Sequence, residues 1–299
     1  MDLSALFDCV TSASCVVTQI STGLLTGMLL FLVAAGLSLI FGILGIVNFA
    51  HGAFYMLGAY FAFAGYEATG SFVVALLCGA LGMAAFGFVV ERLFVSRVYG
   101  HDVLMQLLLC YAFVLILDDA VKIIWGADYK MMGMPGIFAM PPVFVLGGAI
   151  PFYYVFLIGV AALTGITIWL VIGKTRFGKI VRAAAINPQM VSALGVNTRL
   201  VYGIVFAGGS LIAGLAGALA APVRTLTPGM GLSILIESFI VTVIGGMGSI
   251  GGTLVASILI GLTRSFGSIG MPLFVDGLMF LFMALVLIAR PQGLFGRAG

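Results

Sequence analysis

The sequence predicts an all-α, polytopic integral membrane protein with about eight membrane segments, including glycine-broken or re-entrant helices. Of its 299 residues, 63% are hydrophobic and 8% are charged, whereas an ordinary soluble domain has roughly 45–50% and 25%. A water-soluble fold would therefore lack the polar side chains to cover its surface. Glycine accounts for 42 residues, about twice its usual share, which suits close helix contacts in a membrane. We expect one transmembrane domain over residues 1–299.

A helix needs ~20 apolar residues to cross a bilayer. Charge-poor stretches of about that length recur along the whole chain. The residues before the first stretch include Asp2 and Asp8 but no lysine or arginine. The charged start of a secretory signal is therefore missing, and we expect this segment to stay attached. The stretches lie at residues 20–44, 50–66, 71–90, 103–117, 150–173, 200–222, 233–263 and 273–289.

Four cysteines stand at positions 9, 15, 78 and 110, and none has the spacing of a metal site. We expect Cys78 and Cys110 to be small core residues. A disulfide between Cys9 and Cys15 is not the favoured state of that pair.

Basic side chains are concentrated in residues 174–199, which contain no acid. Positive residues gather on the cytoplasmic side of membrane proteins, so we expect this connection to be cytoplasmic. The same reasoning places the amino end and residues 118–149 outside. Arg290 and Arg297 then lie inside only if residues 233–263 are re-entrant rather than crossing once.

Two apolar segments are interrupted by glycine. Five glycines between positions 245 and 252 stand inside residues 233–263, and each glycine in a helix interior costs about 1 kcal/mol. Broken backbone at membrane depth is tolerated where it faces protein or a water-filled cavity. Residues 36–60 form a second glycine-punctuated segment, and paired interruptions point to a transporter's site. We therefore expect pathway residues in both segments, and the candidates are Asn48, His51, Gly52, Glu237, Gly245, Gly246 and Gly248.

Ionisable groups inside a membrane are costly and usually functional. His51 is as well explained by hydrogen-bonded packing as by lining a pathway. Glu237 begins the second glycine-broken segment, so it suits the outer mouth as well as the pathway itself. Asp276 lies close to the start of the last segment and is expected at the interface.

The basic connection at 174–199 carries the signals of a short helix. Asn187 suits the cap, Pro188 the first helical position and Gly195 the stop. The residue before proline avoids helical angles, so the chain should turn sharply there. Such a segment either orients the protein as a basic loop or docks into a cytosolic partner, and the close cap and stop favour docking. The docking residues would be Arg182, Asn187, Pro188, Val191, Leu194 and Gly195.

Several other patterns carry no chemistry. The GMGSIG at 246–251 lacks the strand and the following acid of a dinucleotide site. The GKT at 173–175 lacks the P-loop glycine, because position 168 is Ile168, so we expect no ATP hydrolysis by this chain. Two histidines without paired carboxylates predict neither a catalytic nor a metal site, and dispersed basic residues predict no nucleic-acid binding.

Small residues recur every fourth position at Gly209, Ala213, Gly217 and Ala221. This stripe lets another helix approach closely. Packing within the chain is favoured over a contact between subunits.

Four separated segments resemble the permease subunits of branched-chain amino-acid ABC importers, the LivH type more than the LivM type. They read GLSLIFGILGIVNFAHGAFYMLGAY, RAAAINPQMVSALGVNTR, IVTVIGGMGSIGGTLVASILIG and RPQGLFG. They occur in the expected order and span about residues 20 to 296.

The resemblance implies a helical permease of a bacterial inner membrane that pairs with a second, LivM-like permease, sits on two cytosolic ATPases and receives substrate from a periplasmic binding protein. The connection around Arg182, Asn187, Pro188 and Gly195 would seat in the ATPase. Many ABC permeases have an acid near the start of this element, whereas residues 183–186 offer none. The chain itself would bind no cofactor, with ATP and Mg²⁺ in the ATPases. The NFAHG and GGMGSIGG segments would be pathway or permease-interface elements. Related importers take urea, amides and small carboxylates as well as leucine, isoleucine and valine.

The alternative function is a secondary transporter or channel for small solutes. Ion coupling usually requires a buried acid or a Lys/Arg relay. In this sequence only Glu237 and Asp276 meet that description, so the ATP-driven importer is favoured.

Overall fold

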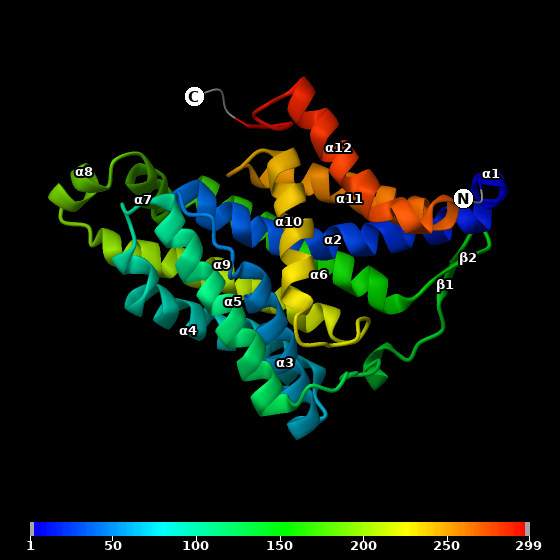
Figure 1. The fold of residues 1–299 in the computed structure, drawn as a ribbon. Coiled ribbons are helices and arrows are strands. Elements are labelled where there is room, and N and C mark those ends of the chain that lie inside the picture. The colour runs from blue at the N-terminus through cyan, green and yellow to red at the C-terminus, as the bar shows by residue number, and fades with distance from the viewer. Residues whose placement is uncertain (1–2, 297–299) are drawn as a thin grey trace.

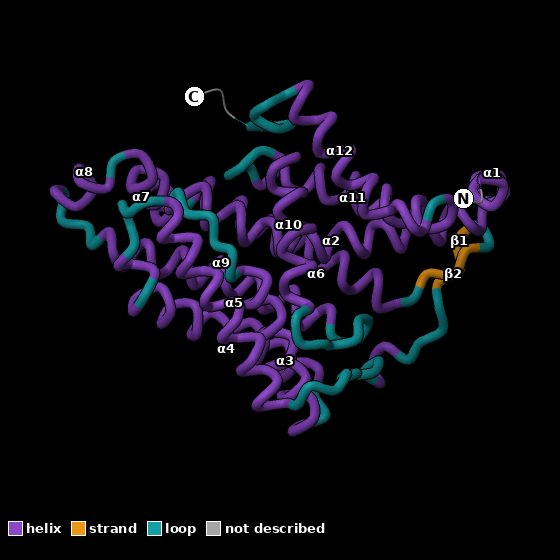
Figure 2. Tube along the Cα trace, in the orientation of Figure 1, coloured by secondary structure: helices purple, strands orange, loops and turns teal. Residues whose placement is uncertain are grey.

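The computed structural model describes residues 3–296, and most of that chain is helical (Figure 2). The α-helices are α1 Leu3–Thr11, α2 Ala13–Leu44, α3 His51–Thr69, α4 Phe72–Leu93, α5 Val103–Trp125, α6 Phe152–Lys174, α7 Arg176–Ile186, α8 Pro188–Ala193, α9 Thr198–Ala220, α10 Met230–Gly245, α11 Ile250–Gly270 and α12 Val275–Ala289. Short 3-10 turns lie at Val95–Arg97, Gly136–Phe138 and Pro272–Phe274, and the strands are β1 Val143–Val145 and β2 Gly148–Ile150.

Within the described residues, six helical stretches are long and apolar enough to cross a membrane: Ala13–Leu44, Phe72–Arg97, Phe152–Lys174, Thr198–Ala220, Ile250–Gly270 and Pro272–Ala289. The expected segments 50–66 and 103–117 correspond to α3 and α5, and the expected 233–263 segment is two helices, α10 and α11. The estimate of about eight segments is therefore approximate. The prediction of a polytopic helical membrane protein is confirmed.

The first long helix, α2, is the centre of the bundle (Figure 1). It is apolar on every side, and 72% of its most apolar window is buried within the chain. A helix that is hydrophobic all round belongs in a core or in lipid. In contrast, only 17% of the corresponding windows in α6 and α12 is buried, so their outer faces are left for lipid or another subunit.

The small-residue stripe of α9 lies inside the bundle. Ala213 and Ala221 are buried, and a Cβ added to Gly217 would overlap the carbonyl oxygen of Tyr55 on α3. A Cβ on Gly209 would lie 2.6 Å from Ile40 on α2. The stripe therefore brings α9 against α2 and α3, as expected for packing within the chain.

The chain reverses direction at residues 246–249, which join α10 to α11. α11 runs antiparallel to α2: the Ser265 hydroxyl donates to the carbonyl oxygen of Gln19 at 2.8 Å, and Gly248 N donates to Ser38 Oγ at 3.1 Å. The chain after α12 returns to the reversal, where Leu294 N donates to the carbonyl oxygen of Ile244 at 2.8 Å. Residues 233–263 therefore return to the side they came from.

Arg290 thus lies at the end of the bundle where α2 ends and where α7 packs against Ile43 of α2. We call this the basic end, because it also carries residues 174–199, and α7 and α8 lie there, opposite the N-terminus (Figure 1). Asp2 and Arg297 lie outside the described residues.

The opposite end departs from the prediction in two respects. The 118–149 connection contains a small hairpin, in which Val143 pairs with Ile150, because Leu146 and Gly147 adopt positive φ and close a tight turn. In addition, Cys9 and Cys15 form a disulfide, which corrects the expectation of unpaired cysteines. The break between α1 and α2 at Ser12 brings their Cα atoms to 5.2 Å. Disulfides are typical of oxidising compartments, which agrees with the external side that the charge distribution predicts for this end.

Candidate coupling and translocation sites

The short helix α8 forms as the sequence predicts. Asn187 is extended, and its Oδ1 accepts a hydrogen bond from Met190 N at 2.9 Å, while Pro188 occupies the first turn. α8 ends at Ala193, and Gly195 has φ +84°, a left-handed conformation that favours glycine. The cap and the stop therefore fix a sharp corner between α7 and α8 and another after α8.

The outer surface of this corner is apolar. Ile186, Met190 and Leu194 have exposed fractions of 86%, 61% and 77%, which is unusual for a segment at the water-facing end of a bundle and typical of a docking surface. Ile186 and Met190 were not among the predicted docking residues. Val191 was among the predicted docking residues, but it is buried. It therefore positions α8 instead of facing a partner. Arg182 is exposed and donates to the carbonyl oxygen of Ile172, which holds α7 against the end of α6.

The inner face of α7 is anchored in the bundle. Val181 is buried in a cluster with Ile43 of α2 and with Val201 and Val205 of α9. Burial of such side chains contributes about 1.5–3 kcal/mol each. α7 is therefore packed directly on α2 and α9.

Replacing Asn187 by alanine should loosen α8. Loss of an N-cap side chain costs about 1 kcal/mol, and the exposed helix has few other contacts to compensate. We expect faster hydrogen exchange at the amides of residues 188–194 by roughly fivefold, measured by mass spectrometry. Asn187→Asp keeps an acceptor and should show near wild-type exchange; equal protection in Asn187→Ala would show that the cap does not hold α8.

The predicted glycine break lies at the basic end, packed by protein. Gly246 and Gly248 have φ of +97° and +86° and make the reversal between α10 and α11. A Cβ on Gly245 would lie 2.5 Å from the backbone of Gly252, and Phe295 N donates to the carbonyl oxygen of Gly245 at 3.2 Å. The break thus joins α10, α11 and the C-terminal segment, at the end of the bundle and not in its middle.

Asn48, His51 and Gly52 lie at the start of α3 and face other helices. Asn48 Oδ1 accepts from Ala50 N at 3.1 Å, and His51 Nε2 lies 3.0 Å from the carbonyl oxygen of Val33. Both side chains are buried. Of the two roles expected for His51, the structure therefore shows hydrogen-bonded packing between helices. Asn48 Nδ2 and His51 Nδ1 have no hydrogen-bond partner within residues 3–296.

Gly52 marks the closest approach of α3 and α10, because an added Cβ would overlap the carbonyl oxygen of Gly231. Gly52→Ala should therefore force the two backbones apart and destabilise the protein by about 1–3 kcal/mol, seen as a lower thermal midpoint in detergent. Gly208→Ala is the control, since no atom lies within 4 Å of an added Cβ there. An unchanged midpoint for Gly52→Ala would contradict this packing.

Glu237 of α10 forms an ion pair that the sequence did not reveal. Its Oε1 lies 2.5 Å from Arg264 Nη1 on α11. Arg264 was missed because it falls just beyond the segment taken to end at residue 263. Glu237 Oε2 and the buried Tyr55 hydroxyl have no hydrogen-bond partner among the residues described. The pair therefore offers one free carboxylate oxygen and, on Arg264, a side chain 31% exposed.

Glu91 was also missed, because it directly precedes Arg92 at a segment edge and reads as interfacial. The structure buries it completely, and the Tyr99 hydroxyl donates to its Oε1 at 2.8 Å. Burial, and secondarily the Glu91 charge, raise the pKa of Tyr99, so this phenol remains a proton donor.

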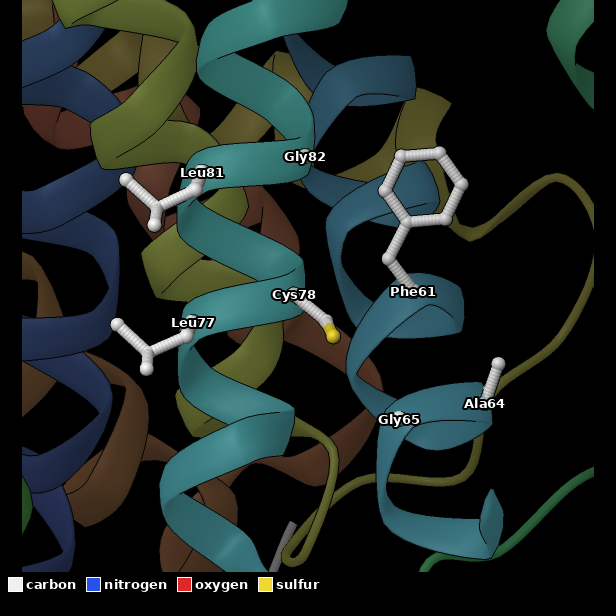
Figure 3. A pocket seen from close by; sticks show the side chains of 7 residues that line it. All are labelled: Phe61, Ala64, Gly65, Leu77, Cys78, Leu81 and Gly82. Carbon is white, nitrogen blue, oxygen red and sulfur yellow. The ribbon is translucent and has the colours of Figure 1, made fainter. Parts of the chain in front are cut away.

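An apolar groove lies between α3 and α4 (Figure 3). Gly65 of α3 faces Cys78 of α4, and the Phe61 ring lies beside Gly82. The exposed Leu77 and Leu81 of α4 also line the groove and point away from α3. None of its lining residues is charged, so the groove suits lipid or another apolar helix and not a polar solute.

Comparison with known proteins identifies the family. The family described as the permease component of branched-chain amino acid transport systems matches residues 19–289. The chain belongs to this family. It is 29% identical to the high-affinity branched-chain amino acid transport system permease protein BraD of Pseudomonas aeruginosa, over 93% of this chain and 95% of that protein. It is 28% identical to LivH of Escherichia coli K12, with the same coverage.

The solved PsaBC structure from Streptococcus pneumoniae, in complex with Fab, contains a similar fold. It has a TM-score of 0.51 and 12% identity and covers 97% of this chain and 95% of that one. The similarity shows the fold alone. Family membership makes the chain a multi-pass transport component and not an enzyme, and a permease component of an ABC transporter works with ATPase and substrate-binding subunits.

Proposed function

We propose that this permease component carries branched-chain or chemically related small amino acids across the inner membrane, driven by two cytosolic ATPases that dock at α7 and α8. The observation that carries the docking site is the exposed apolar corner of Ile186, Met190 and Leu194 at the basic end. The substrate class follows from the named activity of BraD and LivH.

Docking at this corner would couple ATP binding to the membrane helices. ATP can shift the permease between conformations only if the ATPases contact the two conformations differently. α7 is packed on α2 and α9 through Val181, so a displaced α8 moves the helices that form the core. In this proposal ATP and Mg²⁺ bind to the ATPases, and the chain contributes no catalytic group and no cofactor site.

Glu237 and Arg264 supply polar groups for the solute. A branched-chain amino acid is a zwitterion with an apolar side chain. The unpaired Glu237 Oε2 suits its ammonium group, and Arg264 and the Tyr55 hydroxyl suit its carboxylate. Charged groups within membrane helices usually mark a solute path. In this proposal the pair lines the pathway, whereas Asn48, His51, Gly52, Gly245, Gly246 and Gly248 hold the surrounding helices in place.

A LivM-like second permease would complete the path. Many apolar side chains of α4, α5 and α6 are exposed on the single chain, among them Leu81, Leu115 and Ile166, and they leave ample surface for a second permease and lipid. A periplasmic binding protein would deliver the solute to the disulfide-bearing end.

Purification tests this proposal. The tagged chain is extracted in mild detergent, and bound proteins are quantified by mass spectrometry. We expect two ATPase copies and a second permease in near-equal amounts. A chain that purifies alone and moves leucine without ATP would instead establish the secondary transporter.

A further inference from the structure

Three polar side chains, Tyr202, Tyr99 and Glu91, connect α7 to α4, although these two helices are not consecutive in the chain. The Tyr202 hydroxyl of α9 donates to the carbonyl oxygen of Ala184 on α7 at 3.0 Å. The rings of Tyr202 and Tyr99 meet edge to face, with centroids 5.6 Å apart. Tyr99 in turn donates to Glu91 of α4 at 2.8 Å. The result is a continuous path from α7 through α9 to α4.

The carboxylate at the far end of this path is held in a fixed place. Glu91 is fully buried, and a Cβ added to Gly203, the residue after Tyr202, would lie 3.0 Å from Glu91 Oε2. Phe88 closes the same space. A buried carboxylate is costly, and a large apolar side chain would fill this position at no such cost. Membrane helices retain ionisable groups of this kind mainly for function.

We infer that Glu91, Tyr99 and Tyr202 are positioning residues that transmit a displacement of α7 to α4. This inference rests on the proposed docking of the ATPases at α8. When α8 moves, the carbonyl oxygen of Ala184 moves with α7, and the bond to Tyr202 carries that motion to Tyr99 and Glu91. α4 and α9 then shift together, although the apolar face of α7 packs on α2 and α9 and not on α4.

The test uses the complete transporter in proteoliposomes, with the ATP hydrolysed per leucine imported as the readout. Tyr99→Phe and Tyr202→Phe remove one hydroxyl each and keep the ring. We expect each to raise the ratio by about fivefold, the factor equivalent to one net hydrogen bond, with both ATPases still bound. Because the bonds act in series, the double variant should be no worse than either single variant.

Tyr153→Phe is the matched control. Its hydroxyl also donates to a backbone carbonyl, that of Leu219, at 2.6 Å, but outside this path. It should leave the ratio unchanged. Glu91→Gln keeps an acceptor for Tyr99 and should retain most coupling, whereas Glu91→Leu should not.

Wild-type ratios in Tyr99→Phe and Tyr202→Phe, or equal loss in Tyr153→Phe, would overturn this inference alone. A wild-type transporter without ATP-dependent uptake would overturn the proposed function and the inference with it.

Discussion

Replacing Gly195 with valine is expected to lower leucine uptake by roughly tenfold while ATP hydrolysis by the assembled transporter stays near the wild-type rate. Gly195 has φ +84°, and the left-handed region costs an ordinary L-residue about 1–2 kcal/mol, which corresponds to roughly tenfold in an equilibrium. Valine is stiffer still. The strain should rotate the end of α8 away from its docking geometry.

Steric overlap does not explain this expectation, because no atom lies within 4 Å of a Cβ added to Gly195. Gly195→Asn is therefore a clean control, since asparagine tolerates the left-handed conformation. Uptake and hydrolysis are measured on the same proteoliposomes. Normal uptake per ATP in the valine variant would show that this corner does not couple the ATPases to the permease.

Arg264→Gln should both destabilise the permease and stop uptake. Removing one partner of a buried ion pair costs about 3–5 kcal/mol, because the remaining charge is left unpaired. Arg264 is 31% exposed, so the lower value is expected here. The thermal midpoint in detergent and the rate of leucine uptake are the two measurements.

The double variant Glu237→Gln with Arg264→Gln separates stability from transport. It leaves no unpaired charge, so most of the thermal stability should return, whereas uptake should stay low because neither group is left to bind the zwitterion. A double variant that recovers both stability and uptake would show that the pair is structural and does not meet the solute.

The sequence determined the features that depend on local chemistry. Asn187, Pro188 and Gly195 act within one or two turns, so α8 could be placed to within a residue. The reversal of the 233–263 segment was inferred from the glycines and from the need to keep Arg290 inside. Both follow from backbone preferences and charge, which do not require knowledge of distant contacts.

The features that depend on distant contacts were not predicted. Glu237 meets Arg264 only because α10 packs on α11, and Glu91 is buried because Gly203 of α9 lies over it. Likewise, Val191 turns inward because α8 lies against its neighbours. The Cys9–Cys15 disulfide is local, and it was missed because the helix break at Ser12 was not foreseen. A spacing pattern in the sequence predicts which residues share one face of a helix, but it does not predict which element packs against that face.

The most direct test of the central claim is leucine uptake by proteoliposomes that contain the transporter purified through a tag on this chain, with ATP or a non-hydrolysable analogue enclosed on the ATPase side. We predict uptake with ATP and none with the analogue, unaffected by ionophores that collapse proton and sodium gradients. Uptake that persists without ATP and disappears with the ionophores would contradict the account.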